Sequence, residues 1–163
     1  MKKSLFLDID GVLIPDPWRN FLKEIWEKSK GQIKSKDIFG YLFFEPNVIA
    51  LNRIVEATDC DIVISSSWRT RRDLSTFRRM WTERDIEGNI FGLTHILNDS
   101  YANRGDEIQL FLDEYNPKTY CIIDDKDQMN HDQMPYFVRT DYHCGLTLAD
   151  ADKCIKILNN IKI

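Results

Sequence analysis

The chain has 163 residues, of which 43% are apolar and 12% aromatic, and its net charge is −4 at neutral pH. This length predicts one domain over residues 1–163 with enough apolar material for a core, and no run approaches the roughly 20 apolar residues of a membrane span. The acidic balance argues against a general nucleic-acid binder. The apolar run after the N-terminal lysines is too short for a secretion signal, and the four cysteines lack metal-binding spacing, so we expect a cytoplasmic protein.

The first half of the chain predicts two strands and two helices. Residues 4–9 form an apolar strand. Residues 15–31 carry apolar side chains at helical spacing (Trp18, Phe21, Leu22, Ile25 and Trp26), which predicts an amphipathic helix with these five on its buried side. Residues 32–45 are expected to be irregular. Residues 46–58 predict a helix that begins at a proline, and residues 61–67 predict a second strand that ends in three serines.

The second half of the chain continues this alternation. Helices are predicted over 71–81 and 105–115, and apolar strands over 119–125 and 136–140. A final helix over 147–161 begins with a capping box between Thr147 and Asp150. Strands that alternate with helices, and that are continuously apolar, are typical of a parallel sheet covered on both faces. We therefore expect an α/β fold, a Rossmann-like three-layer sandwich with a mostly parallel central sheet flanked by helices.

Polar side chains follow three of the predicted strands, at the edge of the sheet where ligands bind in such folds. Three or four carboxylates in one small space repel each other unless a cation binds them, and oxygen ligands of this kind suit Mg²⁺. Gly11 permits a tight turn whose backbone N–H groups approach an anion, such as a phosphate. The residues concerned are Asp8, Asp10, Gly11, Ser65, Ser66, Ser67, Asp124 and Asp125. Arg104 and Lys118 are both candidates for a cation near the phosphate.

Four segments, "FLDIDGVL", "IVISSSWR", "NRGDEI" and "CIIDDKDQM", resemble the signature motifs of the haloacid dehalogenase (HAD) superfamily in their usual order. The resemblance spans residues 4–140 and implies a Mg²⁺-dependent phosphohydrolase that works through an aspartyl-phosphate. It differs from the usual pattern in the third motif, where an arginine stands in place of the commoner lysine.

The resemblance also implies a role for each matching residue. Asp8 would be the nucleophile, and Asp10 the general acid and base whose backbone carbonyl also binds the metal. Asp8 would hold Mg²⁺ together with Asp124, Asp125 or both. Ser66, or Ser65 if the alignment slides by one residue, would bind the phosphoryl group. Arg104 would be the stabilising cation.

The spacing of the motifs leaves room for a minimal cap or none, which predicts an open site. Six arginines and two acids lie between Arg69 and Arg84, and Arg71, Arg72, Arg78 and Arg79 are expected on one helix face. We therefore include Arg69, Arg71 and Arg72 among the substrate-binding residues and expect a phosphorylated substrate, a nucleotide or a nucleic-acid end. The segments "SSSWR", "RGDEI" and "IIDDKDQ" are also similar to HAD domains associated with RNA repair, including the polynucleotide 3′-phosphatase type.

The sequence leaves two alternatives open. One is a phosphatase of small metabolites, such as nucleotides or sugar phosphates, and the other is a non-catalytic binding module with the same fold. The sequence does not determine the oligomeric state.

Overall fold

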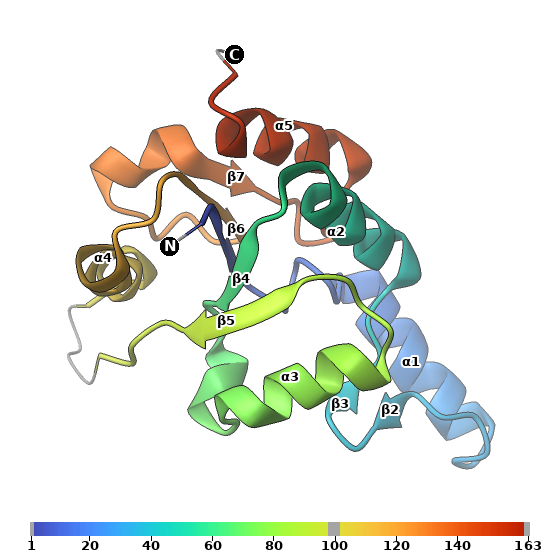
Figure 1. Ribbon diagram of the computed structural model, residues 1–163. Helices are drawn as coiled ribbons and strands as arrows, with labels where there is room; N and C mark the ends of the chain where they lie inside the picture. The colour runs from blue at the N-terminus through green and yellow to red at the C-terminus, as the bar shows by residue number, and fades with distance from the viewer. Residues whose placement is uncertain (1, 98–101, 162–163) are drawn as a thin grey trace.

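The computed structural model describes residues 2–97 and 102–161. Its centre is a sheet of five parallel strands in the order β5-β4-β1-β6-β7 (Figure 1). The strands are β1 (Ser4–Leu7), β4 (Asp61–Ile64), β5 (Asn89–Leu93), β6 (Tyr120–Asp124) and β7 (Phe137–Arg139). Strand β1 is central and pairs in parallel with β4 on one side and β6 on the other.

The described residues form five α-helices, of which four lie between strands in the chain and the last follows β7. They are α1 (Asp16–Lys28), α2 (Glu45–Thr58), α3 (Leu74–Glu83), α4 (Arg104–Tyr115) and α5 (Leu148–Leu158). There are also two 3₁₀ helices among the described residues. The first, Ser67–Thr70, follows β4, and the second, His131–Tyr136, directly precedes β7. The predicted capping box between Thr147 and Asp150 is present at the start of α5.

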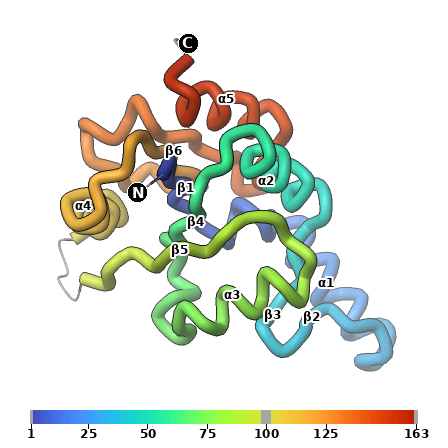
Figure 2. Tube along the Cα trace, viewed as in Figure 1, coloured from blue at the N-terminus to red at the C-terminus, as the bar shows by residue number. Residues whose placement is uncertain are grey.

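The helices cover both faces of the sheet, so the fold is the predicted three-layer sandwich (Figure 2). Helix α4 packs Ile108 and Phe111 against Phe6, Val63 and Ile122 on one face. Helices α2, α3 and α5 cover the opposite face, where the larger apolar cluster lies. The three central strands, β1, β4 and β6, are almost entirely buried, which explains why their sequences are continuously apolar.

Strand β5 and a short hairpin were not predicted. Strand β5 lies at the edge of the sheet and contains Gly92, a residue that is rare in strand interiors, where the ring of Phe111 approaches closely. The hairpin, β2 (Lys36–Asp37) and β3 (Gly40–Tyr41), falls within the segment expected to be irregular. Helix α3 begins at Leu74 rather than at residue 71, because Asp73 caps it by accepting a hydrogen bond from Thr76 N–H at 2.8 Å.

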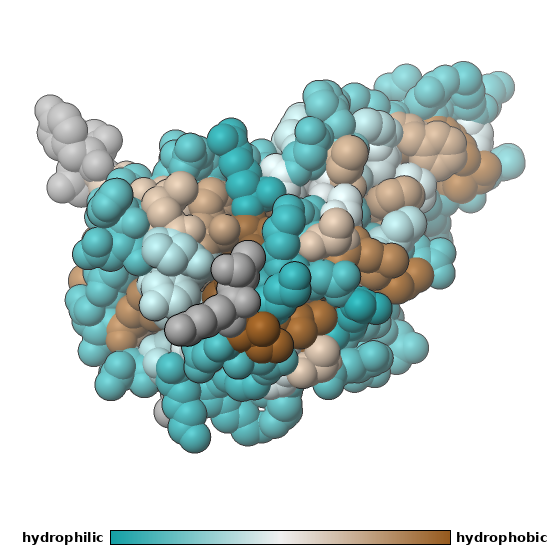
Figure 3. All heavy atoms as spheres, turned by 90° about the horizontal axis from the view of Figure 1, so that it is seen from above, coloured by the Kyte–Doolittle hydropathy of each residue, from teal (hydrophilic) through white to brown (hydrophobic). Residues whose placement is uncertain are grey.

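Helix α1 departs most from expectation. Of its five apolar side chains only Leu22 is buried, whereas Phe21 and Trp26 are each 48% exposed. The helix and the hairpin project beside the sheet at the lower right of Figure 1. In the view from above, the end of this projection shows apolar residues among hydrophilic ones (Figure 3). These two elements make up the whole insertion between β1 and α2, so this segment contains no large cap.

Three of the four cysteines are buried and Cys144 is exposed; all four are free thiols. Within residues 2–97 and 102–161, no helix has the length and hydropathy needed to cross a membrane.

Candidate active site

The register of the sheet brings the polar residues to one edge. Leu7 of β1 lies opposite Ile64 of β4 and Ile123 of β6. The residues that follow these three are Asp8, Ser65 and Asp124. Because the three strands run in parallel, these side chains come from the same level of the sheet, at its carboxyl edge.

Three carboxylates form a buried cluster at this edge. Asp8, Asp124 and Asp125 each offer an oxygen, and these oxygens lie within 4.8 Å of one another. Asp8 is 4% exposed and Asp124 is 2% exposed. Asp125 Oδ1 is buried with no hydrogen-bond partner among the described residues. A buried oxygen without a partner beside two further carboxylates fits a divalent cation with oxygen ligands, so these three residues could hold one.

Gly11 makes this close approach possible. Its φ is +74°, and a Cβ at this position would lie 2.6 Å from Cγ of Asp125. A larger residue would therefore displace Asp125, besides adopting a conformation that L-residues rarely take. The turn that contains Gly11 is also held from the far side, where Thr140 Oγ1 donates a hydrogen bond to its carbonyl at 2.9 Å.

The cluster is electrostatically unfavourable without a cation. The pKa of Asp124 is raised to about 7, mainly by burial and then by the charge of Asp8, with Arg104 acting in the opposite direction. Burial also raises the pKa of Asp8, against the lowering effects of Arg104 and of a hydrogen bond with Ser66. Burial therefore favours a proton or a metal ion at both carboxyl groups.

Arg104 is the cation that lies beside this cluster. Its Nε is 3.8 Å from Asp124 Oδ2, and its guanidinium donates to Ser65 Oγ at 3.4 Å. Lys118, the alternative, is exposed and precedes β6 at the opposite edge of the sheet. Ser65 and Ser66 both lie in the site, one in contact with Arg104 and the other beside Asp8. The structure therefore brings both serines to the cluster rather than selecting one.

The Asp10 side chain is not one of the three clustered carboxylates, and it has partners of its own. It forms an ion pair with Arg19 of α1 and accepts a hydrogen bond from Trp68 Nε1 at 3.1 Å. Neither Arg19 nor Trp68 was predicted as a site residue. The position of Arg19, one turn into the helix that follows the "DID" segment, could have indicated this contact.

Arg69 does not occupy the position expected of a substrate-binding residue. Its side chain is 3% exposed and forms a buried ion pair with Glu107 of α4. It also donates to three backbone carbonyls, those of Ser66, Thr94 and His95. Arg69 thus ties the loops after β4 and β5 to the helix that carries Arg104, and the sequence did not reveal its partner Glu107.

The other predicted arginines do not share one helix face. Arg71 and Arg72 precede α3 and line a pocket of about 360 Å³ together with Asp10, Ser67, Trp68 and Thr70. Arg72 stacks 4.4 Å over the Trp68 ring and donates to the Phe39 carbonyl at 2.7 Å. Arg71 is exposed and has no side-chain partner among the described residues. The remaining arginines have partners: Arg78 with Ile90, Arg79 with Glu83, and Arg84 with Asp37.

An α/β sandwich that gathers an Asp-x-Asp pair, serines, a cation and a second acidic pair at the carboxyl edge of its sheet defines the haloacid dehalogenase superfamily. The chain belongs to the family described as the HAD domain in Swiss Army Knife RNA repair proteins, whose sequence model matches residues 4–151. This match supports an HAD-type phosphohydrolase in general. No curated protein and no solved structure matches the chain significantly.

Proposed function

We propose that the protein is a Mg²⁺-dependent phosphatase that removes a terminal phosphate from a nucleic-acid strand through an aspartyl-phosphate on Asp8. The observation that carries this proposal is the buried cluster of Asp8, Asp124 and Asp125 beside Arg104. Three carboxylates and one arginine leave the site negative, which suits a metal ion, and the metal and arginine together suit a phosphate dianion.

Asp8, Asp124 and Asp125 would hold Mg²⁺, together with the backbone carbonyl of Asp10. When bound, the ion neutralises the negative charge of the carboxylates and of the phosphoryl oxygens. This role agrees with the raised pKa of Asp124, because Arg104 alone does not offset the effects of burial and of the Asp8 charge on this carboxyl group.

The residues of the chain then divide the reaction into two displacements. A carboxylate oxygen of Asp8 forms a bond to phosphorus while the bond to the leaving oxygen breaks, and Asp10 gives that oxygen a proton. Asp10 then takes a proton from water, whose oxygen attacks the phosphorus and releases Asp8 with inorganic phosphate. Ser65, Ser66 and Arg104 bind the phosphoryl oxygens in both steps. The contacts of Asp10 with Arg19 and Trp68 fix the position of its carboxyl group.

Three observations favour a nucleic-acid end as the substrate. The insertion after β1 is short, so the acidic cluster is not enclosed by a large cap. The pocket beside Asp10 is lined by Trp68, Arg71 and Arg72, which offer an aromatic ring and two guanidinium groups to a nucleotide. The family is named for RNA repair proteins.

Arg69 is better described as a positioning residue than as a substrate-binding residue, because its side chain is buried.

Phosphate release from a panel of substrates tests the proposal. The panel contains p-nitrophenyl phosphate, nucleotides, sugar phosphates, and RNA and DNA oligonucleotides phosphorylated at the 3′ or the 5′ end. We expect activity that requires Mg²⁺, is highest on one oligonucleotide class, and is lost in Asp8→Asn. Asp59→Asn, an exposed carboxylate at the other end of the sheet, is the matched control.

Two results would contradict the proposal. Activity on sugar phosphates or free nucleotides alone would identify a small-metabolite phosphatase. An absence of Mg²⁺-dependent release from every substrate would identify a non-catalytic binding module.

A further inference from the structure

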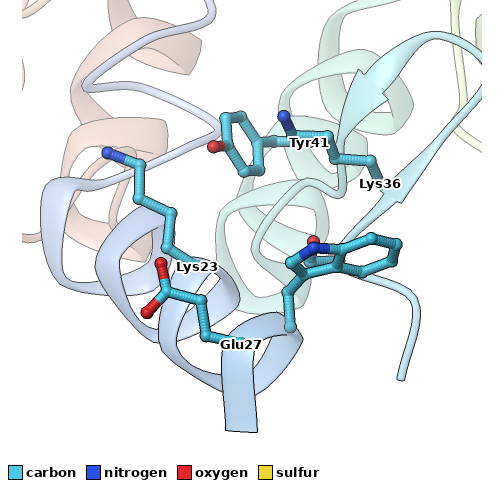
Figure 4. Close-up of a pocket in the computed structure, with 6 residues that line it drawn as sticks. Lys23, Glu27, Lys36 and Tyr41 are labelled. Carbon is cyan, nitrogen blue, oxygen red and sulfur yellow. The ribbon is translucent and has the colours of Figure 1, made fainter. Parts of the chain in front are cut away.

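A second pocket, of about 410 Å³, lies between the second half of α1 and the β2–β3 hairpin. Its volume falls within the range of small-molecule binding sites. Figure 4 shows Lys23 and Glu27 on the wall formed by α1, and Lys36 and Tyr41 on the opposite wall. The full lining is Lys23, Trp26, Glu27, Ser35, Lys36 and Tyr41.

Aromatic rings and lysines make this pocket unlike an ordinary gap between elements. Trp26 is 48% exposed although it belongs to the apolar side of α1. Its ring packs at one edge on Gly31, where a Cβ would lie 3.2 Å from the indole. The Lys36 ammonium lies 4.2 Å over the Tyr41 ring. The pocket therefore presents flat apolar surface and positive charge together.

Helix α1 connects this pocket to the active site. Arg19, Lys23 and Trp26 are spaced i, i+4 and i+7, so they lie along one face of the helix. Arg19 at the start of this face pairs with Asp10. At a rise of about 1.5 Å per residue, Trp26 lies about 10 Å further along the helix axis. A strand whose end reacts at Asp8 would thus meet the pocket a few nucleotides away from that end.

We propose that this pocket binds a nucleobase of the substrate strand, away from its phosphorylated end. The proposal rests on the proposed function, since it requires a nucleic-acid substrate. The base stacks on Trp26, Lys23 and Lys36 contact the flanking phosphates, and Glu27 accepts a hydrogen bond from an N–H at the base edge. Charge agrees with this occupant, because residues 23–36 contain five lysines and two glutamates.

Kinetics on substrates of different length test the proposal. Trp26→Ala should lower kcat/KM for a phosphorylated ten-nucleotide RNA by about 5- to 150-fold, the range that stacking of one base represents. Hydrolysis of p-nitrophenyl phosphate should not change, because this compound does not extend beyond the active site. Trp26→Tyr should retain most of the kcat/KM that Trp26→Ala loses, because a tyrosine ring can also stack on a base. Tyr136→Ala, which removes an exposed aromatic ring that packs on Tyr120, is the matched control.

A binding assay separates this proposal from the proposed function. Fluorescence anisotropy of a labelled ten-nucleotide RNA without a terminal phosphate, and of the matching DNA, reports binding without catalysis. We expect Trp26→Ala and Lys23→Glu to weaken binding of at least one strand, and Tyr136→Ala to leave it unchanged.

The outcomes are distinguishable. Binding that depends on Trp26, in a protein that hydrolyses no phosphoester, would support the pocket and contradict the phosphatase. Hydrolysis of phosphorylated RNA with equal efficiency by Trp26→Ala, or equal binding by this variant, would overturn the pocket and leave the phosphatase intact. If the unaltered protein bound neither strand, the pocket would also be overturned.

Discussion

Replacing Asp124 by asparagine should stabilise the metal-free protein while abolishing its response to Mg²⁺. Asparagine keeps Oδ1, which accepts a hydrogen bond from Lys126 N–H at 2.9 Å, and removes the buried charge next to Asp8. The pKa of Asp124 is about 7 in the folded protein, against an ordinary value of 3.8. The folded state therefore binds more protons than the unfolded state between these values, so stability falls as the pH rises from about 4 to 7 and stays level above.

The size of the effect follows from this difference in pKa. It corresponds to on the order of 4 kcal/mol at pH 8, since each pKa unit represents about 1.4 kcal/mol. We expect Asp124→Asn to recover on the order of 2–4 kcal/mol, which is about 5–15 °C in Tm for a chain of this length. Mg²⁺ should raise the Tm of the unaltered protein, because it binds only the folded state, and should leave that of the variant unchanged.

Thermal unfolding in EDTA and in excess Mg²⁺, from pH 4 to 8, measures both the stability gain of Asp124→Asn without metal and its loss of response to Mg²⁺. The Tm difference between the two proteins in EDTA should grow between about pH 4 and 7. Asp127→Asn, an exposed carboxylate in the same loop, should behave as the unaltered protein in both buffers. If Asp124→Asn were less stable than the unaltered protein in EDTA at pH 8, the assignment of Asp124 as a destabilising, metal-seeking charge would be refuted.

Three further predictions concern the surroundings of the cluster. Gly11→Ala should reduce activity on every substrate by at least about 100-fold and remove the Mg²⁺-dependent gain in Tm, because its Cβ displaces Asp125; normal Mg²⁺ titration would contradict this. Glu107→Gln should lower the free energy of unfolding by about 3 kcal/mol in a urea titration, because it leaves the buried guanidinium of Arg69 without its counter-charge. An unchanged midpoint would contradict a stabilising role of the Arg69–Glu107 ion pair. Arg71→Glu should raise KM for oligonucleotides, more at low salt, without affecting p-nitrophenyl phosphate, whereas Arg79→Glu should have no such effect; equal kinetics in both variants would exclude Arg71 from the binding surface.

The sequence by itself determined the fold class and the edge of the sheet that carries chemistry. Apolar runs that alternate with helical patterns leave few topologies other than a parallel sheet covered on both faces. Parallel strands place their carboxyl ends at one edge, so Asp8, Ser65 and Asp124 had to converge once their strands paired. The positions of residues that directly follow a clear strand pattern were therefore predictable, and so was the proximity of their carboxylates.

Tertiary structure alone decided what each remaining side chain contacts. Arg69 and Arg71 are two residues apart in one basic segment, yet the first is buried against Glu107 and the second is exposed. Helical periodicity predicted that Trp26 would be buried, but its ring is 48% exposed and lines the pocket between α1 and the β2–β3 hairpin. Local pattern fixes which face of a helix is apolar, whereas burial and charge pairing depend on residues distant in the chain, which only the packed fold brings together.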